Sequence, residues 1–394
     1  MEETRAPSLN LAPGKEKALL RHHQWIYSGA VATYPDAETG DVVQVLTAAK
    51  KPIGLAFLNP RGQSIAAHMI ASAGETIEEA LKRKINEAIE LRLKWFNPAE
   101  TNAIRLIHAE GDSLPGLIVD AYNGVLVLQI SHPGIDRYKS LIIDTLRSLL
   151  NPKAIFEKST SFLRKKGGLD EVRAHLVGDP NPEVIALESG MQFTVNVQTG
   201  QKTGLFLDQR EMRAWVRKMA RGKKVLNAFA YTGGFSVTAL LGGALTVDSV
   251  EINAKCEAQC QENIRLNQID STQHRFIAED VFQFVQTADW SYDLVILDPP
   301  AFVKKRQDVP KAFRAYKELN RHVIQNMAPR SILLTASCSY HIDEALFANI
   351  LFRAASEAGR FVKIVSRHIP AIDHPVSIYH PESQYLKSFA LYIE

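Results

Sequence analysis

Cys338 and Asp298 are the residues whose types and settings most clearly predict covalent chemistry. Cys338 stands between two serines after an apolar run, and Asp298 precedes two prolines after another. A thiolate that adds to carbon 6 of cytosine or uracil makes carbon 5 nucleophilic toward a methyl sulfonium, which divides one difficult step into two easier ones. Such a thiol must be exposed and readily ionised, as a polar strand end allows. Asp298 is expected to hydrogen bond the polar edge of the base. The alternatives to these catalytic roles are that Cys338 only packs against its neighbours and that Asp298 only ends a strand.

Two more acids, Glu251 and Asp280, predict a nucleoside site. Glu251 ends a predicted strand at 247–250 and lies 17 residues beyond Gly234. An acid at that place can accept hydrogen bonds from both ribose hydroxyls. Asp280 ends a predicted strand at 275–280, where its carboxylate suits an adenine amine.

The element that positions these acids is residues 223–251, which read as strand, glycine loop, helix and strand. Candidate cofactor residues in this stretch are Asn227, Phe229, Tyr231, Thr232, Gly233 and Gly234. The loop lacks the GxGxxG spacing, and residues 228–230 crowd the place of a dinucleotide pyrophosphate. This argues against NAD and favours an uncharged adenosine derivative such as S-adenosyl-L-methionine. A purely structural turn is the alternative.

Residues 275–280, 292–300 and 331–339 predict more strands of the same sheet, and the strand in 292–300 is apolar throughout. All four acid or thiol candidates then lie at carboxyl ends of strands, the edge at which an open α/β sheet binds ligands. The fold class is therefore α/β, with a Rossmann-like sheet.

The N-terminal residues 8–73 predict a small β domain, with alternating segments at 25–27, 42–46, 52–58 and 65–70. A basic run that includes Arg21 precedes Trp25 and Tyr27. Basic side chains beside aromatic rings can hold phosphates and stack bases of RNA. A solvated turn with two core aromatics fits the pattern equally well.

Residues 75–185 predict a compact α+β domain. Thr76 to Glu79 match a capping box before a helix that runs to about 96. Strands are expected at 104–108, 117–121, 125–130 and 154–157, and a second helix at 137–150. The basic triplet at 164–166 favours a solvated turn over a phosphate clamp. Residues 178–182 are the expected linker into a third domain at 186–394, and the first domain spans 1–74.

Several other residues are candidates for substrate contact. The polar run at 198–204, which includes Lys202, favours a lid or substrate strand over an ordinary loop. A base must be turned out of its stack before carbon 6 can be attacked, and Phe302 is placed to stack on it. Basic residues follow at Lys304, Lys305, Arg306 and Arg314, where RNA contact is favoured over a solvated face.

Bulk properties limit the class of protein. The 394 residues are 46% hydrophobic and 23% charged, with a net charge of +3, which is too small to establish a nucleic-acid partner by itself. The three cysteines cannot form a disulfide framework, and no Cys/His spacing along the chain indicates a metal site. Cys256 and Cys260 are expected to pack. No leader or 18-residue apolar run is present, so a reduced, cytosolic, soluble protein is expected.

The combination resembles the bacterial 23S ribosomal RNA cytosine-5 methyltransferases of the RlmI type. The likeness covers essentially the whole chain and is carried by GKEKALLRHHQWIYSGAV, GDSLPGLIVD, QKTGLFLDQR, NAFAYTGGFSVTAL, LDPPAF, LLTASCS and DHPVSIYHPESQYLKSFAL. It implies an N-terminal PUA domain, a middle strand-strand-helix-strand-strand domain and a class I methyltransferase domain that binds S-adenosyl-L-methionine.

The resemblance also implies roles for single residues. Cys338 would be the nucleophile, Asp298 the base-binding acid and Glu251 the ribose acid, with Gln209 and Arg210 near the amino-acid end of the cofactor. Some related enzymes carry a second cysteine in the Asp-Pro motif, but here Pro300 and Ala301 follow. The base that removes the carbon-5 proton, the target nucleotide and the oligomeric state stay open, with a homodimer as a candidate.

Two other functions compete with this interpretation. An RNA guanine methyltransferase could use the same fold and Asp-Pro-Pro motif, but Cys338 would then have no role. A non-catalytic RNA-binding or assembly protein would not need four reactive side chains at strand ends.

Overall fold

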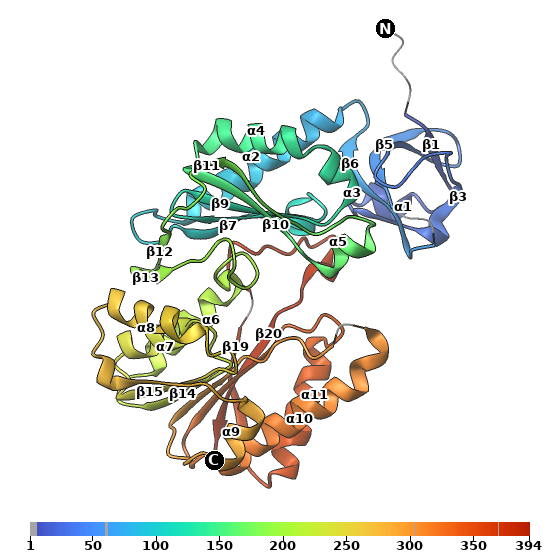
Figure 1. Cartoon of the computed structure of the whole chain (residues 1–394). Coiled ribbons are helices and arrows are strands. Elements are labelled where there is room, and N and C mark those ends of the chain that lie inside the picture. The colour runs from blue at the N-terminus through green and yellow to red at the C-terminus, as the bar shows by residue number, and fades with distance from the viewer. Residues whose placement is uncertain (1–5, 60–61, 304, 369) are drawn as a thin grey trace. The chain divides into compact units, whose positions relative to one another are not determined.

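The computed structural model describes residues 6–59, 62–303, 305–368 and 370–394, and their contacts divide the chain into two compact units (Figure 1). The first contains residues 1–187, 195–205 and 372–383. The second contains 188–194, 206–371 and 384–394. The expected catalytic sheet lies in the second unit, whereas the polar run at 198–204 belongs to the first.

A seven-stranded sheet forms the centre of the second unit, in the order β16-β15-β14-β17-β18-β20-β19. The strands are β14 (Lys224–Ala228), β15 (Thr246–Val250), β16 (His274–Ile277), β17 (Leu294–Leu297), β18 (Ile332–Ser337), β19 (Val362–His368) and β20 (Lys387–Ile393). The first five are parallel, and β20 is antiparallel to both of its neighbours. The carboxyl ends of β14 to β18 therefore meet at one edge, as predicted.

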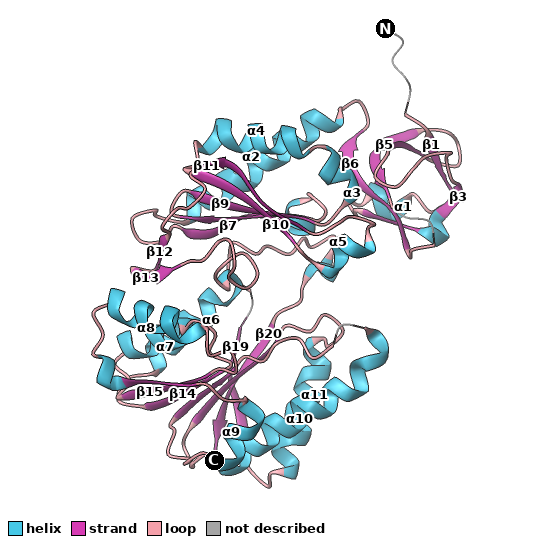
Figure 2. Ribbon diagram, viewed as in Figure 1, coloured by secondary structure: helices cyan, strands magenta, loops and turns pink. Residues whose placement is uncertain are grey.

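Helices cover both faces of this sheet (Figure 2). One face carries α6 (Arg210–Met219), α7 (Gly234–Leu241) and α8 (Cys256–Leu266), and the other carries α9 (Val281–Thr287), α10 (Val309–Asn326) and α11 (Glu344–Glu357). The apolar strands predict this arrangement, because a strand buried on both faces has no polar alternation. Leu294 to Leu297 are all fully buried.

A six-stranded sheet forms from the N-terminal residues, in the order β2-β6-β5-β4-β1-β3. Its strands are β1 (Ser8–Leu11), β2 (Trp25–Tyr27), β3 (Val31–Thr33), β4 (Val42–Leu46), β5 (Pro52–Leu58) and β6 (Ile65–Ser72), with the short helix α1 (Lys17–Leu20) between β1 and β2. The four predicted strands are confirmed. The short strands β1 and β3 were not predicted, because segments of three or four residues carry too little alternation to be recognised.

A five-stranded sheet follows, in the order β11-β10-β9-β8-β7, with two long helices against it. Its elements are α2 (Ile77–Trp95), β7 (Ala103–His108), β8 (Leu117–Tyr122), β9 (Val125–Ile130), α3 (Pro133–Arg137), α4 (Lys139–Leu150), β10 (Ala154–Ser159), α5 (Phe162–Lys166) and β11 (Val172–Gly178). The predicted capping box is present, with reciprocal hydrogen bonds between Thr76 and Glu79. The strands β12 (Ile185–Glu188) and β13 (Met191–Thr194) then lie where the chain passes between the units.

The interpretation of residues 164–166 as a solvated turn is wrong for Arg164. Its side chain is 3% exposed, and its guanidinium donates to the carbonyl of Ile130 and to the carboxylate of Asp136. The triplet lies in α5, and Arg164 stabilises the core of the first unit, since a buried guanidinium needs such partners.

The polar run at 198–204 is attached to the five-stranded sheet through Thr203. The Thr203 hydroxyl donates to Asp120 at 2.6 Å and lies 2.8 Å from the Tyr122 hydroxyl, and Asp120 also accepts two hydrogen bonds from Arg105. All four side chains are buried. This network holds the end of the run in place.

No described helix is long and apolar enough to cross a membrane.

Candidate active site

The loop between β14 and α7 has a backbone that only certain residues tolerate. Phe229 and Tyr231 adopt positive φ angles of 63° and 48°, and Gly233 follows with 78°. Aromatic residues rarely adopt such angles, and strain of this kind concentrates at ligand sites. A Cβ on Gly233 would lie 2.4 Å from the Cys260 sulfur, whereas one on Gly234 would meet only ordinary contacts at 3.6 Å or more. Gly233 is therefore required for both conformation and packing.

We expect Gly233→Ala to lower the free energy of unfolding by about 2–4 kcal/mol, because the left-handed conformation and the overlap with Cys260 each cost about 1–3 kcal/mol. Gly234→Ala is the matched control and should change stability by less than about 0.5 kcal/mol. Chemical denaturation of the two variants measures the difference. Adding Cys260→Ala to Gly233→Ala should recover part of the loss, and an equal effect of both glycine substitutions would contradict this account.

Glu251 lies just beyond β15, 9% exposed, and its carboxylate is fixed by backbone donors. The Tyr231 N–H donates to Oε2 at 3.0 Å, and the Asn253 N–H donates to Oε1 at 2.9 Å. A carboxylate oxygen can accept two hydrogen bonds, so each oxygen keeps capacity for a ribose hydroxyl. This position fits the role predicted for Glu251.

Asp280 lies at the same edge of the sheet but does not end a strand. β16 stops at Ile277, and Asp280 caps α9 by accepting a hydrogen bond from the Gln283 N–H. The expectation of a strand over 275–280 is therefore wrong at its end. The predicted adenine contact stays a prediction, to be made by a carboxylate that a helix N-cap already orients.

Beneath the loop, buried polar side chains form a chain of hydrogen bonds. Asn227 donates to Ser236 at 2.8 Å, the Ser236 hydroxyl lies 2.6 Å from that of Ser249, and Ser249 lies 2.8 Å from His274 Nε2. Burial lowers the pKa of His274 to about 4, so the ring is neutral. Asn227 is fully buried. Its hydrogen bond to Ser236 connects β14 to α7, the two elements that flank the loop.

Asp298 and Cys338 meet at the ends of the adjacent strands β17 and β18. Leu297 pairs with Thr335, and the Cys338 thiol lies 4.0 Å from the carbonyl oxygen of Pro299. Both Asp298 and Cys338 are half-buried, as a reactive group that must meet a substrate requires. Gln209 donates to Asp298 through its side-chain amide. The structure thus brings three sequence-predicted residues together.

Lys387 is a residue of this site that the sequence did not reveal. It pairs with Ser337 across β18 and β20, and its ammonium donates to the carbonyls of Ser339 at 2.7 Å and Tyr385 at 2.5 Å. The side chain is 5% exposed, and burial lowers the pKa of Lys387 to about 8 while the Cys338 thiolate raises it. A lysine within the apolar strand 386–393 is a signal that could have identified it, since lysines are almost never fully buried without a partner.

Two further contacts join the segments around this site. Tyr385 donates to the carboxylate of Asp208 at 2.6 Å, and Tyr316 lies 3.1 Å from the Ser339 hydroxyl. The segments that contain Gln209, Lys387 and Cys338 are therefore connected within the second unit. Spacing along the sequence does not predict these contacts, because the partners are far apart in the chain.

Arg210 has a different setting from Gln209. Its Nε lies 3.4 Å from Glu188, which also receives two hydrogen bonds from Arg213. Glu188 is fully buried and both arginines are 5% exposed or less. Arg210 therefore stabilises the packing of α6, and its predicted place near the cofactor stays a prediction. Cys256 and Cys260 are buried as expected, and burial raises their pKa values to about 11 and 12.

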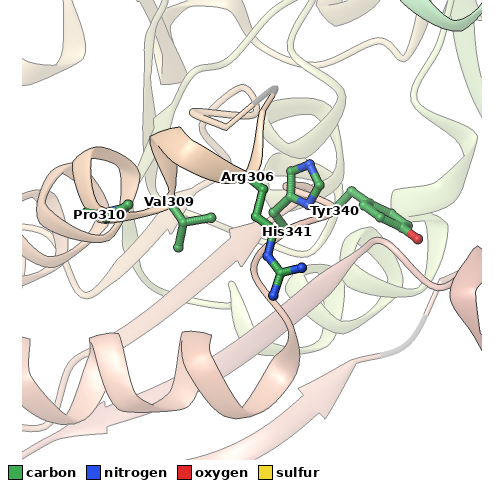
Figure 3. Close-up of a pocket in the computed structure, with 5 residues that line it drawn as sticks. All are labelled: Arg306, Val309, Pro310, Tyr340 and His341. Atoms are coloured by element: carbon green, nitrogen blue, oxygen red, sulfur yellow. The ribbon is translucent and has the colours of Figure 1, made fainter. Parts of the chain in front are cut away.

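Phe302 packs among aromatic rings, and Arg306, one of the basic residues after it, lines a cavity. The Phe302 ring packs 4.5 Å from Tyr316 and 5.9 Å from Phe282, centroid to centroid, so it is half-buried. An open cavity of about 670 Å³ lies between the start of α10 and the loop after β18, lined by Arg306, Val309, Pro310, Tyr340 and His341 (Figure 3). Lys305 is exposed, and Lys304 lies outside the described residues.

Only some of the basic side chains on α10 are available to contact RNA. Lys311 and Arg314 are exposed, but Lys317 forms ion pairs with Glu318 and Glu357 at 3.1 and 2.6 Å. Arg321 pairs with Glu318 at 2.9 Å. Two acids, Glu318 on α10 itself and Glu357 on α11, therefore pair with basic side chains of this helix. RNA contact through Arg314 stays a prediction.

The candidate RNA-binding residues in the first unit differ in how exposed they are. Arg21 and Lys202 are exposed. Trp25 is half-buried and packs edge-on against His380, with ring centroids 4.2 Å apart. Its ring is therefore engaged within the protein, and base stacking by Trp25 stays a prediction.

Comparisons with known proteins show the family of this chain. A family model described as S-adenosylmethionine-dependent methyltransferase matches residues 104–375, and a PUA-like domain model matches residues 9–67. The chain belongs to this methyltransferase family. The enzyme is therefore an S-adenosylmethionine-dependent methyltransferase with a PUA-like N-terminal domain, and the class I fold is confirmed.

Its relatives are similar along their full length. A protein named Ribosomal RNA large subunit methyltransferase I from Cronobacter sakazakii is 36% identical over 392 residues, which cover 98% of this chain and 99% of the relative. A protein of the same name from Yersinia pseudotuberculosis is 37% identical and covers 97% and 98%. The methyltransferase belongs to the same family as these relatives.

Solved structures show the same fold. One from Streptococcus mutans, assigned as a candidate S-adenosylmethionine-dependent methyltransferase, has 25% identity and a TM-score of 0.84 and covers 98% of this chain and 99% of that chain. Another, a methyltransferase complexed with SAH, has 24% identity, the same TM-score and the same coverage.

Proposed function

We propose that this methyltransferase forms 5-methylcytosine in the 23S ribosomal RNA of the large subunit through a covalent bond between Cys338 and cytosine C6. The names of the relatives support ribosomal RNA as the substrate. The observation that carries the cytosine chemistry is the position of the half-buried Cys338 thiol, 4.0 Å from the Pro299 carbonyl in the motif that begins with Asp298.

Cys338 acts as the nucleophile in this mechanism. Its thiolate adds to C6 of the base, forming a sulfur–carbon bond and moving the ring electron pair to C5. The loop at 229–234 and Glu251 would hold S-adenosylmethionine, which would supply an electrophilic methyl group and leave as S-adenosylhomocysteine. After C5 is methylated, loss of the C5 proton and cleavage of the sulfur–carbon bond restore the ring and release the thiolate.

Asp298 orients the base in the pocket. Its carboxylate accepts a hydrogen bond from Gln209, which fixes one oxygen. Accepting a hydrogen bond from the exocyclic amine of cytosine would place C6 toward Cys338. A base whose polar edge carries other hydrogen-bonding groups would not be oriented in this way by Asp298.

Lys387 supports the thiolate form of Cys338. The Cys338 thiolate raises the pKa of Lys387 against the effect of burial, so the thiolate and the ammonium stabilise each other. The two carbonyls of Ser339 and Tyr385 hold the ammonium in place. Lys387 acts through Cys338 and is a positioning residue.

We expect Lys387→Met to lower kcat/KM for methyl transfer by about 10- to 100-fold at pH 7.5, since an adjacent cation is lost. In the wild type, Lys387 is charged below pH 8 and neutral above it, so the rate should fall as the pH rises through about 8. Lys387→Arg keeps the charge and should move this decline to higher pH. Identical pH profiles in all three proteins would contradict the proposed role.

The proposed function is tested by transfer of labelled methyl groups from S-adenosylmethionine to 23S ribosomal RNA, followed by mapping of the modified base. Label at C5 of a cytosine supports the proposal. Label on a guanine would instead support the guanine methyltransferase that the same fold allows. Absence of transfer to RNA and to assembling large subunits alike would contradict the proposal.

We also propose that the chain forms three domains with different roles. Residues 1–74 form the PUA-like domain, 75–185 the middle domain and 186–394 the methyltransferase domain, with RNA held by Arg21, Trp25, Lys202, Phe302, Lys305, Arg306 and Arg314. A cytoplasmic location follows from the ribosomal substrate. A homodimer belongs to the same proposal, and light scattering of the purified chain tests it.

A further inference from the structure

Two histidines and a glutamate meet in the first unit, although they are far apart in sequence. His23 lies two residues before the start of β2, and His380 and Glu382 lie in the connection before β20. In the part of the chain that the structure describes, their ligand atoms all lie within 4.8 Å of one another. His23 Nε2 is 3.7 Å from Glu382 Oε1, and His380 Nδ1 is 3.5 Å from Glu382 Oε2.

His380 is buried without any hydrogen bond to its ring. Its side chain is 0% exposed, and among the described residues neither ring nitrogen has a hydrogen-bond partner. The indole of Trp25 packs against the ring and offers no acceptor. Buried polar groups are almost always satisfied, so an imidazole in this position indicates a missing partner that accepts its lone pair.

The surroundings also orient the other two side chains as ligands. His23 Nδ1 lies 3.2 Å from both the carbonyl oxygen and the backbone nitrogen of Trp25, so the backbone engages Nδ1, and Nε2 is the ring nitrogen near Glu382. The Tyr27 hydroxyl donates to Glu382 Oε1 at 3.4 Å. Histidines that bind metals commonly donate their second N–H to a carbonyl, and carboxylate ligands are likewise hydrogen-bonded.

The spacing of the cluster matches a tetrahedral ion. Ligand atoms about 2.1 Å from zinc at tetrahedral angles are about 3.4 Å apart. The two histidine nitrogens lie 3.7 and 3.5 Å from different oxygens of Glu382, and all ligand atoms lie within 4.8 Å of one another, so side-chain rotation must bring them together around the ion. Two imidazoles and one carboxylate are a donor set typical of Zn²⁺ with a fourth, water-occupied position.

We propose that His23, His380 and Glu382 bind a zinc ion, with water as the fourth ligand. The ion joins the connection at 377–383 to the turn before β2. No metal site was predicted from residue spacing, because His23 and His380 are 357 positions apart in the chain. The proposal is independent of the methylated base and of the role of Cys338.

Titration of the full-length, chelator-treated chain with Zn²⁺ in a calorimeter tests the proposal. We expect one zinc ion per chain, and His23→Gln and Glu382→Gln should each weaken binding by at least about tenfold. His175→Gln is the matched control, because His175 is an exposed histidine on β11 of the same unit, and it should leave the affinity unchanged. Both test positions are partly exposed, so these variants should fold.

A second measurement locates the ion. Co²⁺ bound beside His380 should quench the fluorescence of Trp25, whose ring centroid lies 4.2 Å from that of His380. Trp25→Phe should remove the metal-dependent part of the signal. Absence of stoichiometric binding, unchanged affinity in His23→Gln and Glu382→Gln, or quenching that persists in Trp25→Phe would each overturn the proposal.

Discussion

Cys338→Ala is expected to reduce methyl transfer to ribosomal RNA by more than about a thousandfold, because the variant lacks the nucleophile that activates C5. Binding of S-adenosylmethionine should be unchanged, since Cys338 lies at the end of β18 and Glu251 at the end of β15. Single-turnover transfer and calorimetry measure the two effects separately.

The matched control for this substitution is Cys256→Ala. Burial raises the pKa of the Cys256 thiol to about 11, so this thiol is a poor nucleophile at neutral pH. Its loss should lower transfer by less than about tenfold. Undiminished transfer by Cys338→Ala would contradict covalent catalysis and favour guanine as the target base.

Asp298→Asn should lower kcat by about 10²- to 10⁴-fold, the range found when a positioned acid or base is lost from an active site. The amide is similar in size and can still accept the hydrogen bond from Gln209, so the local fold should be kept. The amide presents an N–H donor where the carboxylate accepts from the cytosine amine, so the base is no longer held with C6 toward Cys338. Comparison of kcat and KM over a range of RNA concentrations checks this.

Asp293→Asn provides the control on the same strand. Asp293 is exposed at the opposite end of β17, where it accepts a hydrogen bond from the Lys224 N–H. An asparagine can accept the same bond, so transfer should change by less than about twofold. Equal losses in the Asp293 and Asp298 variants would show that charge near the sheet, and not the position of Asp298, controls the rate.

The sheet of the second unit could be predicted because its strands carry strong local signals. Leu294 to Leu297 and Ile332 to Leu334 are continuous apolar runs, which are typical of strands covered on both faces. Polar residues directly after such runs predict the ligand-binding edge. Glu251, Asp298 and Cys338 were identified for this reason, and the structure places all three there.

Other features depend on contacts that spacing along the chain does not encode. Gln209 reaches Asp298, and Lys387 reaches Ser339, across 89 and 48 residues. The cluster of His23, His380 and Glu382 forms only when distant segments pack together. Asp280 was predicted to end a strand, but it is the N-cap of α9. An acid after a strand fits either position, so the sequence alone does not distinguish them.

Covalent trapping tests the central claim most directly. An RNA fragment that carries 5-fluorocytidine at the mapped position should form an adduct that persists, because fluorine at C5 cannot leave in place of the proton. We predict a complex, stable to denaturation, whose mass equals protein plus methylated RNA, with the modification on the peptide that contains Cys338. Absence of any stable complex with an RNA that is methylated normally as cytidine, or an adduct at another residue, would contradict the account.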